Sequence, residues 1–96
     1  MKVIGITQRF YRNTEYFEER DCLDQKWMNF FQHLDYLPII IPNNLSIFEL
    51  LLNKIKFDGF VITGGNNLVE YGGDCPTRDK VEIRIIEHSI SGKIPI

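Results

Sequence analysis

The apolar positions of the chain follow two periods, and each change of period marks an expected element. Short apolar runs rich in β-branched residues predict buried strands over 2–7, 37–41 and 57–63, with a fourth beginning at 93–96. Apolar residues at helical spacing predict helices over 21–35, 47–56 and 77–91. Strands and helices therefore alternate, which predicts an α/β fold with a parallel sheet and right-handed crossovers.

Residues at the ends of the expected helices refine this prediction. Pro38 should end the first helix, because the residue before a proline disfavours the helical conformation. Ser46 and Thr77 are suitable N-caps, and Gly92 can adopt the positive φ that often follows a helix. In the last helix we expect one apolar row, formed by Ile83, Ile86 and Ile90 and widened by Val81 and Ile85.

Three connections follow the carboxyl ends of the predicted strands, at 8–20, 42–46 and 64–77. Parallel α/β sheets bind ligands at this edge. The first connection is charged and aromatic, and we expect a surface loop. Its arginines, interleaved with tyrosines, would suit a phosphate or a nucleotide. The alternative is a solvated loop that packs its tyrosines on the body of the protein.

Composition and charge narrow the class of protein. Ninety-six residues suggest one small domain, and a net charge of −2 gives no electrostatic footprint for nucleic acid or an anionic membrane. Cys22 and Cys75 have no framework spacing, which suits a reducing compartment. The start of the chain lacks a signal peptide, and no run reaches the ~20 apolar residues of a membrane span. We therefore expect a cytoplasmic protein.

The glycine pair after the third predicted strand is the main candidate for chemistry. Gly64 and Gly65 allow a close approach of the backbone to a ligand. Backbone N–H groups that converge there can bind an anion, or the negative oxygen of an acyl-transfer intermediate. The alternative is a structural turn, and the residues alone leave both open. The sequence has neither a G-x-G-x-x-G pattern nor a complete P-loop, and we expect no cofactor and no metal.

Four segments carry a family resemblance in the right order: Ile4–Arg9, Asp21–Trp27, Asp58–Asn67, and Arg78-Asp79 at the start of a helix. Together they resemble the gamma-glutamyl-gamma-aminobutyrate hydrolase group of the class I glutamine amidotransferase-like superfamily. The resemblance implies a flavodoxin-like fold, of which residues 1–96 would be the amino-terminal part of a single domain. It also implies that the backbone of Gly64 or Gly65 supplies oxyanion-hole donors.

The catalytic nucleophile of that family is a cysteine in a Gly-x-Cys-x-Gly turn, activated by a histidine that a carboxylate orients. The turn follows the strand that would begin at 93–96, and the sequence ends at Ile96. The resemblance therefore implies that nucleophile, histidine and acid are absent from these 96 residues. We expect Cys22 to be buried on a helix, Cys75 to be a free loop thiol, and His33 and His88 to have no catalytic role.

Three residues are candidates for substrate binding: Asn66, Arg78 and Arg9. Arg78 is a cation in the first turn of a helix, where it opposes the macrodipole, so another group should recruit it. That group would be the α-carboxylate of a gamma-glutamyl substrate, through a bidentate pair. The alternative is an internal salt bridge to Glu70, Asp74 or Glu82.

Three hypotheses follow for the function. The chain is part of a cysteine-dependent hydrolase of a gamma-glutamyl amide, either gamma-glutamyl-GABA-like or a nucleotide-linked amidate. Alternatively it is a catalytically inactive remnant, or a small α/β module that binds an anion. The expected partners are a small-molecule substrate and either the remainder of the same domain or a second copy of the chain, without nucleic acid or membrane. An uncovered sheet edge should make the isolated chain marginally stable.

Overall fold

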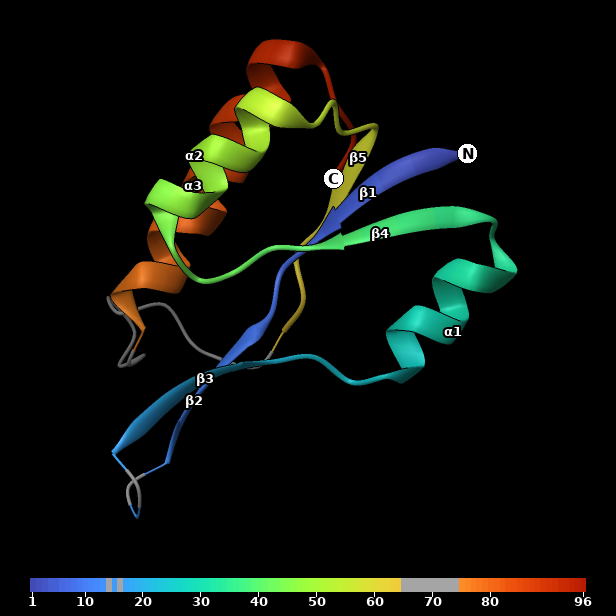
Figure 1. Cartoon of the computed structure of the whole chain (residues 1–96). Helices are drawn as coiled ribbons and strands as arrows, with labels where there is room; N and C mark the ends of the chain where they lie inside the picture. Colours follow the sequence, from blue (N-terminus) through green and yellow to red (C-terminus); the bar gives the residue numbers. More distant parts are fainter. Residues whose placement is uncertain (14, 16, 65–74) are drawn as a thin grey trace.

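The computed structural model describes residues 1–13, 15, 17–64 and 75–96, which form two sheets and three helices (Figure 1). In chain order the elements are β1 (Lys2–Ile6), β2 (Arg9–Asn13), β3 (Glu18–Cys22), α1 (Lys26–His33), β4 (Tyr36–Ile40), α2 (Leu45–Lys54), β5 (Gly59–Val61) and α3 (Pro76–Gly92). Apart from the β2–β3 hairpin, strands and helices alternate. This confirms the predicted α/β fold.

The main sheet is parallel, with the strand order β4-β1-β5. Helices α2 and α3 cover one of its faces, and α1 lies on the other (Figure 1). After α3 the chain returns to the sheet, where the Phe60 N–H donates to the Pro95 carbonyl at 3.0 Å. The segment 93–96 thus lies beside β5, but it forms no regular strand. Lys93 still belongs to the helix cap, and Pro95 has no N–H to donate to a ladder.

The larger core lies between the sheet and the helices α2 and α3. Its buried members are apolar and largely aromatic: Ile41, Phe48, Phe57, Phe60, Val81 and Ile85. Gly5 allows this packing, because a Cβ there would lie 2.7 Å from Cδ1 of Phe60. The smaller core, under α1, contains Ile4, Ile6 and Phe31. The two faces of the sheet are therefore covered unequally.

The segment 8–20 is mostly an antiparallel hairpin, and its prediction as a surface loop is wrong. Strands β2 and β3 pair from Arg9 opposite Cys22 to Asn13 opposite Glu18. The pairing satisfies backbone groups that a loop would leave to water, while Phe10 is buried. Cys22 closes β3 and is half-buried, so its placement on a helix is also wrong. The hairpin contains Asp21 and Cys22, which were predicted to belong to the first helix.

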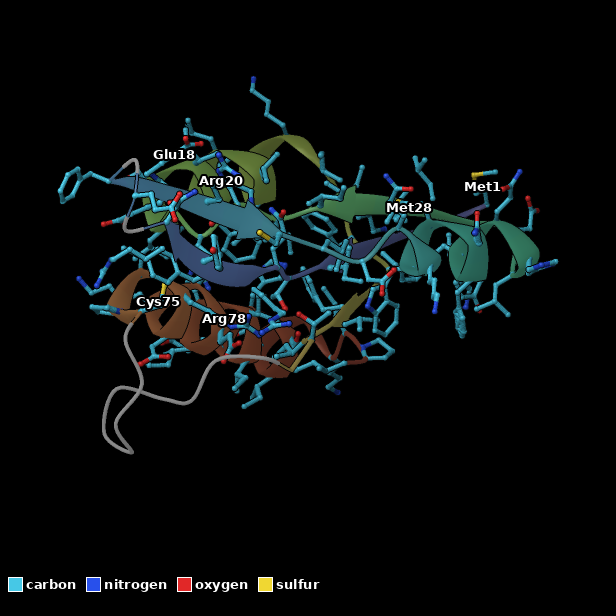
Figure 2. All side chains as sticks on the ribbon, turned by 90° about the horizontal axis from the view of Figure 1, so that it is seen from below. Met1, Glu18, Arg20, Met28, Cys75 and Arg78 are labelled. Carbon is cyan, nitrogen blue, oxygen red and sulfur yellow. The ribbon has the colours of Figure 1, made fainter. Side chains whose placement is uncertain are left out.

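An exposed ion pair joins two residues of β3. The Arg20 guanidinium donates hydrogen bonds of 2.8 and 3.2 Å to the Glu18 carboxylate (Figure 2). These bonds, and then the positive charge of Arg20, lower the pKa of Glu18 below its ordinary value. The stabilisation is present above the pKa of unfolded glutamate and is lost as the pH falls through the lowered, folded value. Because the pair is exposed, its contribution is small.

The helix ends differ from those predicted. The N-cap of α2 is Asn44, whose Oδ1 accepts from the Ile47 N–H at 3.0 Å, instead of Ser46. The N-cap of α3 is Cys75 instead of Thr77. After α3 the left-handed conformation belongs to Lys93, with φ of 56°, instead of Gly92. In each case the cap lies one or two residues from the expected position.

We expect Asn44→Ala to lower the free energy of unfolding by about 1 kcal/mol, because it removes the acceptor for an N–H of the first turn. Ser46→Ala is the matched control. Ser46 lies inside α2, where alanine is a better helix former, so this change should be neutral or slightly stabilising. Urea denaturation of both variants tests the prediction. Equal effects would contradict the assignment of the cap.

The buried face of α3 contains only part of the predicted apolar row. Val81 and Ile85 are buried, whereas the isoleucine row is largely exposed: Ile83 55%, Ile86 43% and Ile90 74%. The buried stripe also contains Arg78 and Ser89, two polar residues. Of the predicted row, only the two residues that widen it are therefore buried.

Candidate functional site

Polar side chains at the carboxyl ends of β1 and β5 form a hydrogen-bonded cluster. The Thr63 N–H donates to Oγ1 of Thr7 at 2.8 Å, and the Thr63 hydroxyl donates to the Thr7 carbonyl at 3.2 Å. Thr7 is 1% exposed, and its own N–H donates to the Val61 carbonyl at 3.0 Å. The two strand ends are therefore joined through a buried threonine just before the glycine pair.

The end of β4 and the hairpin join the same cluster. Gln8 donates its side-chain amide to the Ile41 carbonyl at 3.0 Å. The side chain of Asn43 donates to the Gln8 carbonyl at 3.3 Å and to the Asp21 carboxylate at 2.9 Å. Because Asp21 belongs to β3, these bonds hold the hairpin against the edge of the parallel sheet. None of these residues was predicted as a site residue from the sequence.

Arg78 enters this cluster from the first turn of α3 and is 2% exposed (Figure 2). Its Nε donates to the Glu82 carboxylate at 2.8 Å, which confirms the internal salt bridge considered as an alternative. Its Nη1 donates to the Gln8 carbonyl at 2.7 Å. Its Nη2 donates to the carbonyl of Thr63 and lies 3.5 Å from the carbonyl of Gly64. One guanidinium thus joins α3 to two strand ends.

Cys75 is a free thiol, and it is buried, with 2% exposure, at the N-cap of α3 (Figure 2). Its sulfur accepts from the Arg78 N–H at 3.4 Å and lies 3.2 Å from Oγ1 of Thr77. The thiol therefore caps the helix that presents Arg78. Cys22 is likewise a free cysteine.

The other predicted site residues have different surroundings. Gly64 is exposed directly after the Thr63 cluster, and a Cβ there would meet nothing within 4 Å. Arg9 is exposed at the start of β2. Gly65 and Asn66 lie outside the described residues. The structure thus brings Gly64 and Arg78 together.

The two histidines have different places. His33 is exposed at the end of α1. His88 is half-buried, with its ring centroid 6.1 Å from that of Phe60.

Within the part of the chain that the structure describes, no helix is long and apolar enough to cross a bilayer.

The geometry defines an α/β protein with a buried polar cluster at the carboxyl edge of a parallel sheet, the edge where such folds bind their ligands. Residues 2–96 match the Peptidase C26 family, and the chain belongs to this family. The family assignment confirms the resemblance to the class I glutamine amidotransferase-like hydrolases.

A gamma-glutamyl-CDP-amidate hydrolase from Campylobacter jejuni is similar to this chain, with 31% identity over 100 aligned residues. The alignment covers 97% of this chain and 48% of that protein. The chain therefore spans about half the length of this relative. The family and the name of the relative support a gamma-glutamyl amide hydrolase family for the chain.

Proposed function

We propose that this chain supplies the oxyanion-stabilising part of a cysteine-dependent hydrolase that cleaves a gamma-glutamyl amide. The observation that carries the proposal is the position of Gly64, which is exposed at the carboxyl edge of the sheet and follows a buried network. The Gly64 peptide N–H and the following one at Gly65 would donate to the negative oxygen that develops when the amide carbonyl is attacked. A donor of this kind contributes about 3–4 kcal/mol of transition-state stabilisation.

The nucleophilic cysteine and its histidine and acid come, in this proposal, from outside residues 1–96. Residues 1–96 are then the amino-terminal part of a single domain. Two features support this. The relative is about twice as long as the matched segment, and an apolar groove lies beside α1 on the less covered face of the sheet. The groove is lined by Trp27, Phe30, Leu34, Val61, Pro95 and Ile96, among others.

For the substrate, Arg9 is the candidate contact to a phosphate, because it is exposed at the start of the hairpin. Such a contact would suit a nucleotide-linked gamma-glutamyl amidate, which the name of the relative also favours over gamma-glutamyl-GABA. Asn66 remains a predicted substrate contact, whereas the guanidinium of Arg78 is bonded to Glu82 and to backbone carbonyls of the protein itself. The two free thiols agree with a reducing, cytoplasmic location.

The test is glutamate release from a gamma-glutamyl nucleotide amidate and from gamma-glutamyl-GABA. We expect no release by the chain alone. We expect release after co-expression with the second half of the Campylobacter jejuni relative, and loss of this release when the cysteine of that half is replaced by alanine. Release by the chain alone would contradict the proposal. Binding of phosphate or glutamate without hydrolysis in any combination would favour the anion-binding module instead.

Two surface variants test whether activity requires the groove to pack against the second half of the enzyme. Phe30 lines the groove and is 48% exposed, whereas Ile47 lies on α2, on the opposite face of the sheet, and is 45% exposed. Phe30→Ser should abolish activity in the co-expressed pair, and Ile47→Ser should retain it. Both single chains should unfold at similar urea concentrations, because both side chains are already half exposed.

A further inference from the structure

The contacts of Arg78 are directed at backbone carbonyls of the candidate site. Among the bonds described above, Nη2 donates to the carbonyl of Thr63 and approaches that of Gly64 at 3.5 Å. These are two successive carbonyls, and the first belongs to the peptide unit that contains the Gly64 N–H. Arg78 therefore contacts the peptide whose N–H is the proposed oxyanion donor.

This contact also sets the direction of the Gly64 N–H, because the Thr63 carbonyl and the Gly64 N–H belong to one peptide unit. A trans peptide is planar, so its N–H points away from its C=O. The described residues contain no cis peptide bond. A guanidinium bound to the Thr63 carbonyl thus directs the Gly64 N–H away from α3. The residue that precedes this peptide is held as well, because the N–H and the hydroxyl of Thr63 donate to Thr7.

The remaining contacts hold the guanidinium itself in place. Nε is paired with Glu82, whose side chain is 18% exposed, and Nη1 is bonded to the carbonyl of Gln8, between β1 and β2. A buried charge requires such a partner and satisfied donors. A lysine has the charge but a single nitrogen, and it cannot reproduce this planar set of contacts.

We propose that Arg78 is a positioning residue, which orients the Gly64 amide for the oxyanion and does not bind the substrate. This inference rests on the proposed function for the role of the amide, but the orientation itself can be measured without hydrolysis. Arg78 would then act through the peptide between Thr63 and Gly64. Its substitution should change the order of Gly64 and the turnover number more than the Michaelis constant.

The experiment is nitrogen-15 relaxation of Gly64 in the full chain, for the natural sequence and for Arg78→Lys. We expect the order parameter of the Gly64 amide to fall from about 0.85, typical of rigid backbone, to below about 0.6 in Arg78→Lys. The matched control is Arg84→Lys on the same helix. Arg84 pairs with Glu49 on α2, so its substitution should leave Gly64 unchanged. In the co-expressed pair, Arg78→Lys should lower kcat at least about tenfold, with KM within about twofold.

The outcomes separate this inference from the proposed function. If Gly64 loses order in Arg78→Lys although the natural pair shows no hydrolysis, the positioning holds and the hydrolase proposal fails. If Gly64 keeps its order, the positioning role is overturned. If KM rises and kcat does not change, Arg78 binds the substrate and the inference is again overturned. If Arg78→Lys does not fold, the same measurement is made on Arg78→Ala with added guanidinium ion. If the ion does not restore the order of the Gly64 amide, the inference is overturned.

Discussion

Gly64→Pro is expected to lower kcat of the co-expressed pair about 10²- to 10³-fold. Proline has no backbone N–H, so the substitution deletes the proposed oxyanion donor itself. The donor acts mainly in the transition state, and KM should therefore change little. Glutamate release from a gamma-glutamyl substrate, measured over a range of substrate concentrations, gives both constants.

Gly64→Ala is the control for this experiment, because it keeps the N–H and adds only a methyl group. A Cβ at Gly64 would meet nothing within 4 Å, and its φ lies outside the left-handed region, so alanine should fit without strain. We expect near-natural activity from the alanine variant. Equal losses in both variants would show that the glycine is needed for its shape, and equal retention would show that its N–H is not a donor.

The order of the main elements could be predicted because each has a strong hydrophobic period. The hairpin could not, since most residues of β3 are exposed and charged and give no apolar alternation. Its pairing depends on contacts with the rest of the chain. The Asp21 carboxylate, for example, accepts from the Asn43 N–H at 3.0 Å, 22 residues away.

The face of α3 could not be predicted for a related reason. The buried stripe contains Arg78, which is stable there only because Glu82 and several carbonyls surround it. No rule based on hydrophobicity would bury an arginine before these partners are known. The sequence therefore indicated the length of the helix correctly, but only the apolar part of its buried stripe, Val81 and Ile85.

The candidate site, too, could be predicted only in part from the sequence. A glycine after a buried strand indicated the ligand edge, because that signal is local. The network that holds it was not predicted, since Thr63 lies 56 residues from Thr7 and Arg78 lies 70 residues from Gln8. These contacts exist only when β1 and β5 pair in register. A polar residue at the end of each apolar run, Thr7 and Thr63, was the available signal.

Phe48→Ala is expected to cost about 3–5 kcal/mol of the free energy of unfolding. Phe48 is 0% exposed on α2, and its ring lies 6.2 Å from that of Phe60 in an edge-to-face arrangement. A domain of this size has only about 5–15 kcal/mol in total, so the variant should lose much of its stability. Leu50→Ala on the same helix is the control, with an effect within about 0.5 kcal/mol, because Leu50 is 58% exposed. Chemical denaturation of both variants measures the difference.

The same substitution also tests how the core supports the candidate site. Val81 and Ile85 belong to the cluster of Phe48, and they hold α3 against the sheet. Because α3 presents Arg78, a loosened core should reduce the order of the Gly64 amide under conditions where the chain is still folded. Leu50→Ala should leave that amide unchanged. A Phe48→Ala variant that is destabilised but keeps Gly64 rigid would show that the Thr7, Thr63 and Arg78 contacts hold the edge without help from the core.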